Sequence, residues 1–307
     1  MRKLNIIIPT LALAVAAGAL AVRSGTTQPA PSKLVVGIYA PSVEFGTSQQ
    51  RLEYVQGLAK AIEAQTGVKT EAKSFASFSA LKGAGVDFAI LDAQCYASNL
   101  GYNVLANARI GDNTSRGWAL YASGASSMQE LKGKKLAYVQ TGCNDNAFID
   151  NAMLESEVDA GFFAGRVGKP DVTAAVAEVA SYKGAQAVFA PSGAQKGLAK
   201  LFDTGSVPNP AFVQVNSKVP SATASSVGKA VTSFGGGGAI SGWAAPSKNP
   251  YQGLNGRMGR VTKRGVFAAP DPVRFDVKDV LVEPASLNEA AAPDVDLHFE
   301  EPPTRME

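Results

Sequence analysis

Residues that could carry nucleophilic or metal chemistry are few and far apart in this sequence. His298 is the only histidine, and it lies in an acidic C-terminal segment. A Ser/His/Asp triad or a multi-histidine metal centre is therefore not available in the rest of the chain. Cys143 lacks a histidine that would act as its base, which favours a structural or paired cysteine. The sequence predicts a protein that is not an enzyme and calls for no cofactor and no metal.

Other chemistry-bearing patterns have structural explanations. The glycines at 235–238 match neither a P-loop nor a dinucleotide-binding fingerprint, and they predict a flexible turn. Glu155 and Glu157 are two positions apart and would face apart on a helix, so they do not form a glycosidase pair. Cys95 and Cys143 could form a disulfide in an oxidising compartment, but their separation of 48 residues leaves the pairing open.

The first half of the chain alternates short apolar runs with amphipathic segments. Residues 33–40 and 68–75 are predicted strands, and residues 49–66 carry apolar positions at helical spacing before Gly67. After a short helix, residues 86–91 are apolar enough to lie inside a sheet. The order β-α-β-α-β is typical of a parallel sheet covered by helices.

The second half repeats this alternation. The predicted elements are strands at 118–123, 135–139, about 161–166, 187–190 and 207–215, a short helix at 128–132, and helices from 147, over 171–182 and over 222–234. The loop 140–146 opens the helix from 147, with Asn144 or Asp145 as its expected N-cap.

Both ends of the chain have distinct compositions. Arg2 and Lys3 precede an uncharged apolar stretch that ends in small residues at Ala19 and Ala21. This pattern predicts a signal peptide over 1–21 and a linker over 22–32; an uncleaved membrane anchor is the alternative. Residues 267–307 are proline-rich and acidic, which predicts a mostly disordered tail that could bind a partner.

The distribution of charged residues argues against a nucleic-acid partner. The net charge is +3, and residues 271–307 hold ten acidic against three basic residues, which leaves +10 on the first 270 residues. The basic residues are scattered and form no Lys/Arg run, so nucleic acid is not an expected partner.

Several segments resemble the phosphate, phosphite and phosphonate-binding proteins of ABC transporters. The matching stretches are KLVVGIYAPS, QTGVKTEAKSFASFSAL before GVDFAILDA, SSMQELKGKKLAYVQTGCNDNAF, and PNPAFVQVNSKVP followed by SGWAAPSKNPYQGL. The resemblance implies an α/β, two-lobed type II periplasmic binding protein, in which each lobe is a mainly parallel sheet flanked by helices and a cleft separates the lobes. It implies lobe one over 33–117 plus about 216–266, and lobe two over 118–215.

A hinged pair of such lobes would hold a ligand between them, where loops follow the carboxyl ends of the strands. The candidate ligand-binding residues lie in these loops: Tyr39, Ser42, Ser77, Phe78, Asp92, Thr141, Asn144, Asp145, Asn146 and Lys169. The loop 141–146 is an expected anion site unless a carboxylate already occupies it. Asp145 departs from the Ser-Thr-Ser-Gly run of the family, and it would repel a phosphate unless it only caps the helix. Lys169 is the candidate for an anionic end, with a solvated loop lysine as the alternative.

The resemblance implies a protein exported to the periplasm that captures a small polar solute, with an oxyanion or phosphonate among the candidates, for the membrane permease of an ABC transporter. A second hypothesis is that the same fold serves as a structural or interaction subunit of a periplasmic or envelope assembly.

Overall fold

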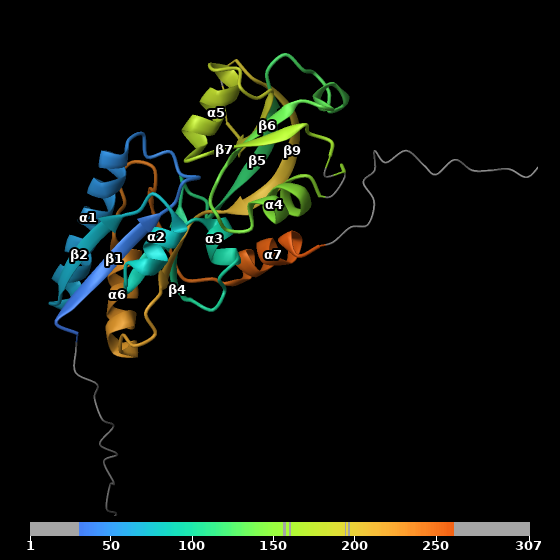
Figure 1. The fold of residues 1–307 in the computed structure, drawn as a ribbon. Coiled ribbons are helices and arrows are strands. Elements are labelled where there is room, and N and C mark those ends of the chain that lie inside the picture. Colours follow the sequence, from blue (N-terminus) through green and yellow to red (C-terminus); the bar gives the residue numbers. More distant parts are fainter. Residues whose placement is uncertain (1–30, 156–157, 160, 194, 196, 261–307) are drawn as a thin grey trace, which may run out of the picture. The chain divides into compact units, whose positions relative to one another are not determined.

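Two β-sheets organise the chain. The computed structural model describes residues 31–260, except 156, 157, 160, 194 and 196. The predicted signal peptide (1–21), most of the predicted linker and the acidic tail (267–307) lie outside these residues. We refer to each sheet with its covering helices as a lobe (Figure 1).

The first sheet has six strands in the order β11-β4-β10-β3-β1-β2. Their bounds are β1 Lys33–Tyr39, β2 Lys69–Ser74, β3 Phe88–Leu91, β4 Asn103–Arg109, β10 Ala211–Gln214 and β11 Gly242–Ala244. β1 pairs in parallel with β2 and β3, while β10 pairs antiparallel with both β3 and β4. β1, β2, β3 and β4 therefore run in one direction, and β10 and β11 run in the other.

Helices α1 (Ser48–Thr66) and α6 (Ser221–Ser233) cover one face of this sheet. α1 begins where the Thr47 side chain accepts a hydrogen bond from the Gln50 amide. It ends at Gly67, which takes a left-handed conformation at φ 68°. Its buried stripe packs against alternate residues of β1, as a helix period of 3.6 and a strand period of 2 require. The smaller helices α2 (Phe78–Gly83) and α3 (Ala93–Ala97) lie on the opposite face.

The second sheet has five strands in the order β7-β6-β8-β5-β9. The bounds in this lobe are β5 Ser115–Ala122, β6 Lys135–Val139, β7 Gly165–Lys169, β8 Ala187–Pro191, β9 Ala199–Pro208, η1 Gln129–Leu131, α4 Asp145–Ala147, η2 Phe148–Met153 and α5 Val172–Ala180. β6 pairs in parallel with β7 and β8, whereas β5 pairs antiparallel with β8 and β9. Only β5 runs against the other four. Both sheets are mixed: two of the five strand pairs in the first sheet and two of the four in the second are parallel, and helices flank each sheet.

The chain crosses between the lobes twice in the strand region, from β4 to β5 and from β9 to β10. The predicted second lobe boundary is at about 216, and residues 207–215 are predicted as one strand. Instead, β9 ends at Pro208 in the second sheet, and β10 belongs to the first sheet from Ala211 onward. Pro208 and Pro210 explain the break, because proline has no amide hydrogen to continue a ladder.

Two other predicted elements are shifted or altered. The strand expected at 161–166 is β7, at Gly165–Lys169. The helix expected from 147 is a single turn, α4, followed by the π-helical turn η2. The predicted helices 171–182 and 222–234 correspond to α5 and α6.

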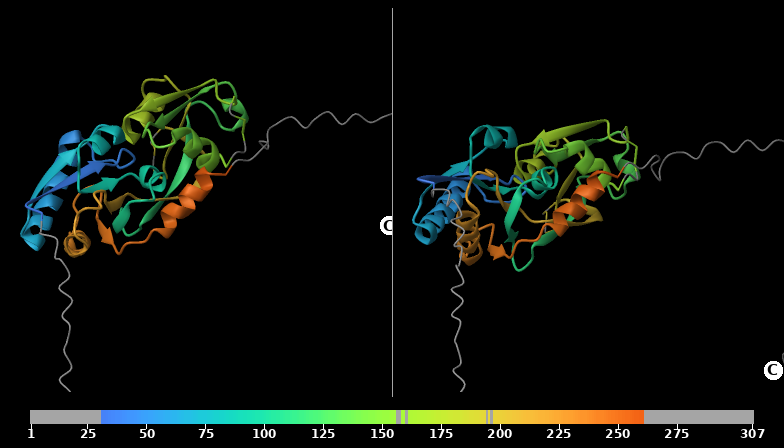
Figure 2. Two further views of the ribbon diagram at one scale, coloured as in Figure 1. Left: turned by 60° about the horizontal axis from the view of Figure 1, so that its bottom comes forward. Right: turned by 90° about the horizontal axis from the view of Figure 1, so that it is seen from below.

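Helix α7 (Asn249–Met258) joins the lobes a third time. It packs against α3 of the first lobe and against η2 and β9 of the second (Figures 1 and 2). One apolar core runs through this region and includes Leu91, Trp118, Phe189 and Tyr251 from both lobes. The lobes are thus continuous in their packing as well as in their chain.

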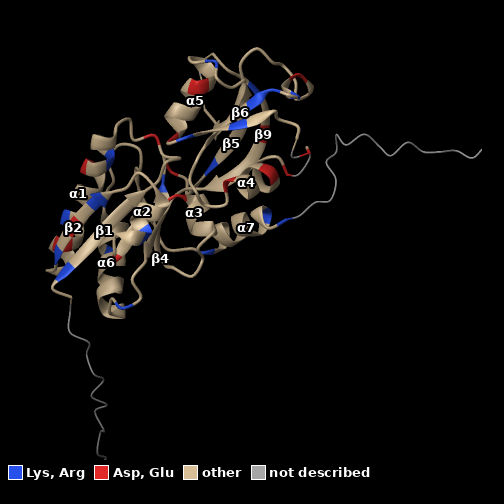
Figure 3. Cartoon of the chain, viewed as in Figure 1, with Lys and Arg blue, Asp and Glu red and all other residues tan. Residues whose placement is uncertain are grey.

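Within residues 31–260, no described helix combines the length and apolar character needed to cross a membrane. Among the described residues, lysines and arginines occur in both lobes and on several helices and strands (Figure 3). This distribution agrees with the scattered basic residues in the sequence.

Candidate functional site

The predicted cleft loops meet between the two lobes. β1 and β3 of the first sheet end at Tyr39 and Leu91, and β6 of the second sheet ends at Val139. The Tyr39 hydroxyl donates a 3.0 Å hydrogen bond to the carbonyl of Thr141 across the interface. Burial and the nearby carboxylates of Asp92 and Asp145 raise the pKa of Tyr39, so this hydroxyl stays protonated and remains a donor.

Asp145 fills the predicted anion position of the 141–146 loop. Its Oδ1 accepts hydrogen bonds from the Thr141 amide (3.1 Å) and the Thr141 hydroxyl (2.6 Å), and its Oδ2 accepts from the Gly142 amide at 3.0 Å. Gln94 Nε2, from the first lobe, donates to Oδ1 at 2.7 Å. The side chain therefore turns back into the loop, while Asn144 takes the N-cap position of α4 without a side-chain cap.

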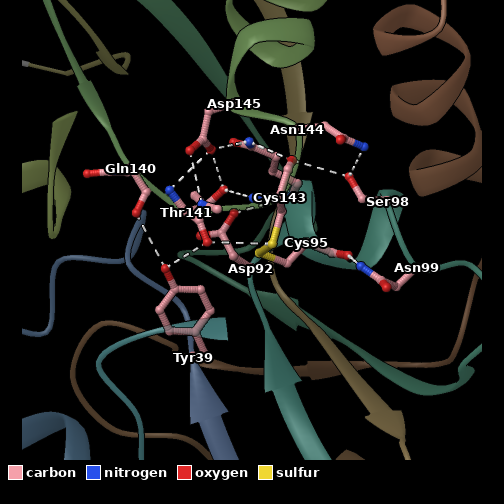
Figure 4. The surroundings of a disulfide bond; sticks show 12 residues. Tyr39, Asp92, Cys95, Ser98, Asn99, Gln140, Thr141, Cys143, Asn144 and Asp145 are labelled. Atoms are coloured by element: carbon pink, nitrogen blue, oxygen red, sulfur yellow. Dashed lines mark hydrogen bonds between the residues drawn. A yellow bond between two sulfur atoms is a disulfide. The ribbon is translucent and has the colours of Figure 1, made fainter. Parts of the chain in front are cut away.

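Cys95 and Cys143 form a disulfide that joins the two lobes, which settles the pairing that the sequence left open (Figure 4). Cys95 lies in α3 of the first lobe and Cys143 in the loop after β6, with 4.9 Å between their Cα atoms. Both cysteines are buried. Gln94 Nε2 and the Ser98 hydroxyl donate to the Cys143 carbonyl beside the bond. The two lobes are therefore joined covalently at this point.

Asp92 is held in the interior beside this junction. It caps α3 by accepting from the Gln94 amide, and its other oxygen accepts from the Ser42 amide at 3.0 Å. Burial raises the pKa of Asp92, whereas these hydrogen bonds and the charge of Arg116 oppose the rise. Arg116 of the second lobe donates to the Ser42 carbonyl and to Asn209, so it fixes the 40–44 loop against the crossing segments.

A cavity of about 440 Å³ lies next to these contacts and is partly open to solvent. It is lined by Tyr39, Ala76, Ser77, Phe78, Ser79, Gln140, Thr141, Gly142, Gly168 and Pro170. Both lobes contribute, at the ends of β1 and β6 and at the start of α2. None of these described lining residues is charged, while hydroxyl, amide and backbone groups supply hydrogen-bonding partners. This arrangement suits a small polar solute.

A second space between the lobes is almost filled. It measures about 20 Å³, which is room for about one water molecule. Its lining includes Asp92, Gln94 and Asp145 together with Trp118 and Phe148. Four of the ten predicted site residues, Ser42, Asp92, Thr141 and Asp145, line this small space.

The structure places the ten predicted site residues in three groups. Tyr39, Ser77, Phe78 and Thr141 line the larger cavity; Ser42, Asp92 and Asp145, with Thr141 again, line the small one; and Asn144, Asn146 and Lys169 line neither.

The last group is engaged elsewhere. Lys169 forms an ion pair with Glu178, so its cation is already matched by a carboxylate. Asn146 accepts from Arg166, and Asn144 donates to Ser98 at 3.4 Å. These contacts favour structural roles for the three residues.

Gln94, Gln140 and Gly142 lie at the site but were absent from the sequence-based set. Gln94 follows the predicted strand end by three residues, and its amide became important only because the second lobe brings Asp145 to it. Gln140 and Gly142 fall within the predicted 140–146 loop, which gave a signal for the segment but not for these two positions. Within the described residues, no three His, Cys, Asp or Glu side chains are grouped to hold a metal ion.

Comparison with known proteins identifies the fold. The sequence matches no family model and no curated protein. Among solved structures, PhnD1 of Prochlorococcus marinus in complex with methylphosphonate has a TM-score of 0.58 at 12% identity, covering 74% of this chain and 97% of its own. A binding protein component of an ABC phosphonate transporter from Pseudomonas aeruginosa has a TM-score of 0.57 at 12% identity, with coverages of 71% and 83%. XAC2383 of Xanthomonas citri, bound to ATP, has a TM-score of 0.56 at 12% identity, with coverages of 74% and 97%.

The chain has the fold of a type II periplasmic binding protein. It resembles the phosphonate-binding proteins in particular, as the sequence segments indicated. At 12% identity the likeness concerns the fold alone. The identity of a solute has to be argued from the residues that line the cavity.

Proposed function

We propose that this protein is an exported solute-binding protein, without catalytic activity, that captures a small polar solute between its lobes and delivers it to the permease of an ABC transporter. The observation that carries the proposal is the cavity of about 440 Å³ at the ends of β1 and β6. In open α/β sheets, ligands bind beyond the carboxyl ends of the strands, and here both lobes supply uncharged hydrogen-bonding groups at that place.

Export to the periplasm is supported by two independent features. The first 21 residues have the charge and apolar pattern of a signal peptide. The buried disulfide between the lobes is of a kind that persists in oxidising compartments and is rare in a reducing cytosol. The acidic tail, which lies outside the described residues, stays a predicted partner-binding segment.

Solute entry does not require wide separation of the lobes. The disulfide and the Tyr39–Thr141 hydrogen bond hold one side of the junction, while the cavity beside them is partly open to solvent. We therefore propose that the lobes close over the solute by a small rotation about this fixed side.

The test is a binding measurement on the mature chain with its disulfide intact. Thermal shift and calorimetry would be run against glucose, ribose, glycine, glycine betaine, arginine, phosphate and methylphosphonate. A solute at 100 times its dissociation constant should raise the melting temperature by about 5 °C or more. Replacing Ser79 with tryptophan should fill the cavity and weaken that binding by about tenfold or more.

Ser48→Trp is the matched control, because Ser48 is also an exposed serine in the first turn of a helix but lines neither interlobe cavity. It should leave the affinity unchanged. If no solute shifts the wild-type melting temperature, or if Ser79→Trp and Ser48→Trp bind equally well, capture of a solute in this cavity is wrong. A role as an interaction subunit would then account for the fold.

A further inference from the structure

Asp145 has the surroundings of a bound anion. Its carboxylate accepts four hydrogen bonds, from the Thr141 amide and hydroxyl, the Gly142 amide and the Gln94 side chain. The donors come from both lobes, since Gln94 belongs to α3 and the others follow β6. Three of these donors belong to residues only three or four positions before Asp145, whereas the fourth, Gln94, is 51 residues away in sequence.

These donors would hold a free oxyanion in the same way. Hydrogen bonds to an ionised acceptor are about twice as strong as those between neutral groups, and two backbone amides that converge on one carboxylate form a small anion-binding nest. No lysine or arginine donates to Asp145 among the described residues, so the negative charge is balanced by N–H and O–H dipoles alone. Arg166 donates a hydrogen bond to the neighbouring Asn146 side chain and forms an ion pair with Asp150.

We propose that Asp145 is a built-in oxyanion that occupies an anion subsite shared by the two lobes. It pins the lobes together through Gln94, and it keeps free phosphate, phosphonate or carboxylate groups out of that position. The inference rests on the proposed function only in its consequence for the solute: the captured molecule is uncharged, zwitterionic or cationic, not a dianion.

Two features of the interlobe region support this consequence. The described residues that line the larger cavity carry no charge, so an anionic solute would meet no countercharge there. The small cavity is lined by the carboxyl groups of Asp92 and Asp145 and by no lysine or arginine, so it too offers an anion no countercharge.

Chemical rescue tests the inference. In Asp145→Ala the four donors lose their acceptor, and the variant should melt below the wild type. Sodium formate at about 100 mM should then raise its melting temperature by about 3 °C more than sodium chloride at equal ionic strength, because formate returns a carboxylate to the same donors. The wild type should show no such difference between the two salts.

Asp171→Ala is the matched control. Asp171 also accepts from a backbone amide, that of Ala174, but it caps α5 alone and receives no donor from the other lobe in the hydrogen bonds of the described residues. Its variant should not respond to formate beyond the chloride effect. Asp145→Asn gives a second variant that keeps one acceptor oxygen, so folding should be retained; hydrogen exchange at the Thr141 and Gly142 amides should be faster in it than in the wild type.

Equal responses of Asp145→Ala to formate and chloride, with unchanged amide exchange in Asp145→Asn, would overturn the inference. This outcome is distinct from failure of the proposed function. Formate rescue measures the donor set itself, whereas solute capture is measured on the wild-type chain in the neighbouring cavity.

Discussion

The buried side chain of Asp92 makes the stability of the folded protein depend on pH. Asp92 is buried, with 3% of its surface exposed, and its carboxylate accepts hydrogen bonds from the amides of Ser42 and Gln94. Burial nevertheless raises its pKa above the ordinary 3.8. The folded protein therefore binds the proton more tightly than the unfolded chain does, and this residue contributes stability at low pH that is lost as the pH rises through the folded pKa.

We expect Asp92→Asn to remove this pH dependence. The free energy of unfolding of the wild type should carry a contribution from Asp92 that falls with increasing pH above about 4, by at most about 1.4 kcal/mol per pH unit. The asparagine variant should lack that contribution, and it should be less stable by about 1–3 kcal/mol because one of the two amides loses its acceptor. Urea denaturation between pH 4 and pH 7 measures both effects. Parallel stability curves for the two proteins would contradict the assignment.

Helix α7 satisfies carbonyl groups of the second lobe. Arg257 donates to the carbonyls of Ser206 and Thr204 at 3.0 and 2.9 Å, and also to that of Ala152. On the other side of the helix, Asn255 donates to the Ala97 carbonyl at the end of α3. Burial lowers the pKa of Arg257 from its ordinary value, but a guanidinium still keeps its proton at neutral pH.

Replacing Arg257 with alanine should therefore destabilise the protein by about 1–3 kcal/mol, since carbonyl oxygens lose their donors at a partly buried position. Guanidinium denaturation provides the measurement. Arg260→Ala is the control, because Arg260 is exposed and lies one turn away on the same segment. Similar losses for the two variants would show that charge, and not the carbonyl contacts, accounts for the effect.

The Cys95–Cys143 disulfide links the two lobes covalently. It closes a loop across 48 residues of sequence separation that includes the crossing from β4 to β5. A cross-link of this size restricts the unfolded chain and typically contributes about 2–4 kcal/mol to stability. It also ties the Asp145 loop to α3, on which Gln94 lies.

The double variant Cys95→Ser/Cys143→Ser should lose about that amount of stability in urea denaturation, and reduction of the wild type with dithiothreitol should bring the two proteins to similar midpoints. Hydrogen exchange should rise in the 141–148 segment while the centre of the first sheet stays protected. Unchanged exchange in that segment would mean that packing of the shared core alone joins the lobes.

Much of this architecture follows from local sequence patterns. The helices α1 and α6 and the strands β1, β3 and β6 were predicted because their apolar residues repeat at helix or strand spacing over the whole element. α7 was missed because its sequence, NPYQGLNGRM, contains two glycines and two asparagines, which are weak helix formers; tertiary packing against both lobes overrides them.

The contacts within the candidate site could not be predicted from the sequence, because most of them form between the two lobes. The loops could be placed at strand ends, but their mutual contacts depend on how one lobe meets the other. The pairing of Cys95 with Cys143 and the approach of Gln94 to Asp145 are such contacts, with sequence separations of 48 and 51 residues. The filling of the predicted anion position by Asp145 therefore became visible only in three dimensions.

The position of α7 late in the chain has a consequence for the order in which the disulfide and this helix form. Arg257 reaches back to carbonyls 51, 53 and 105 residues earlier, and α7 covers α3, where Cys95 lies. A polypeptide that emerges from a translocation channel with its amino terminus first would present both thiols well before this helix follows. Before α7 docks, the thiols are accessible to an oxidant; once it docks, it covers α3 and the buried Cys95.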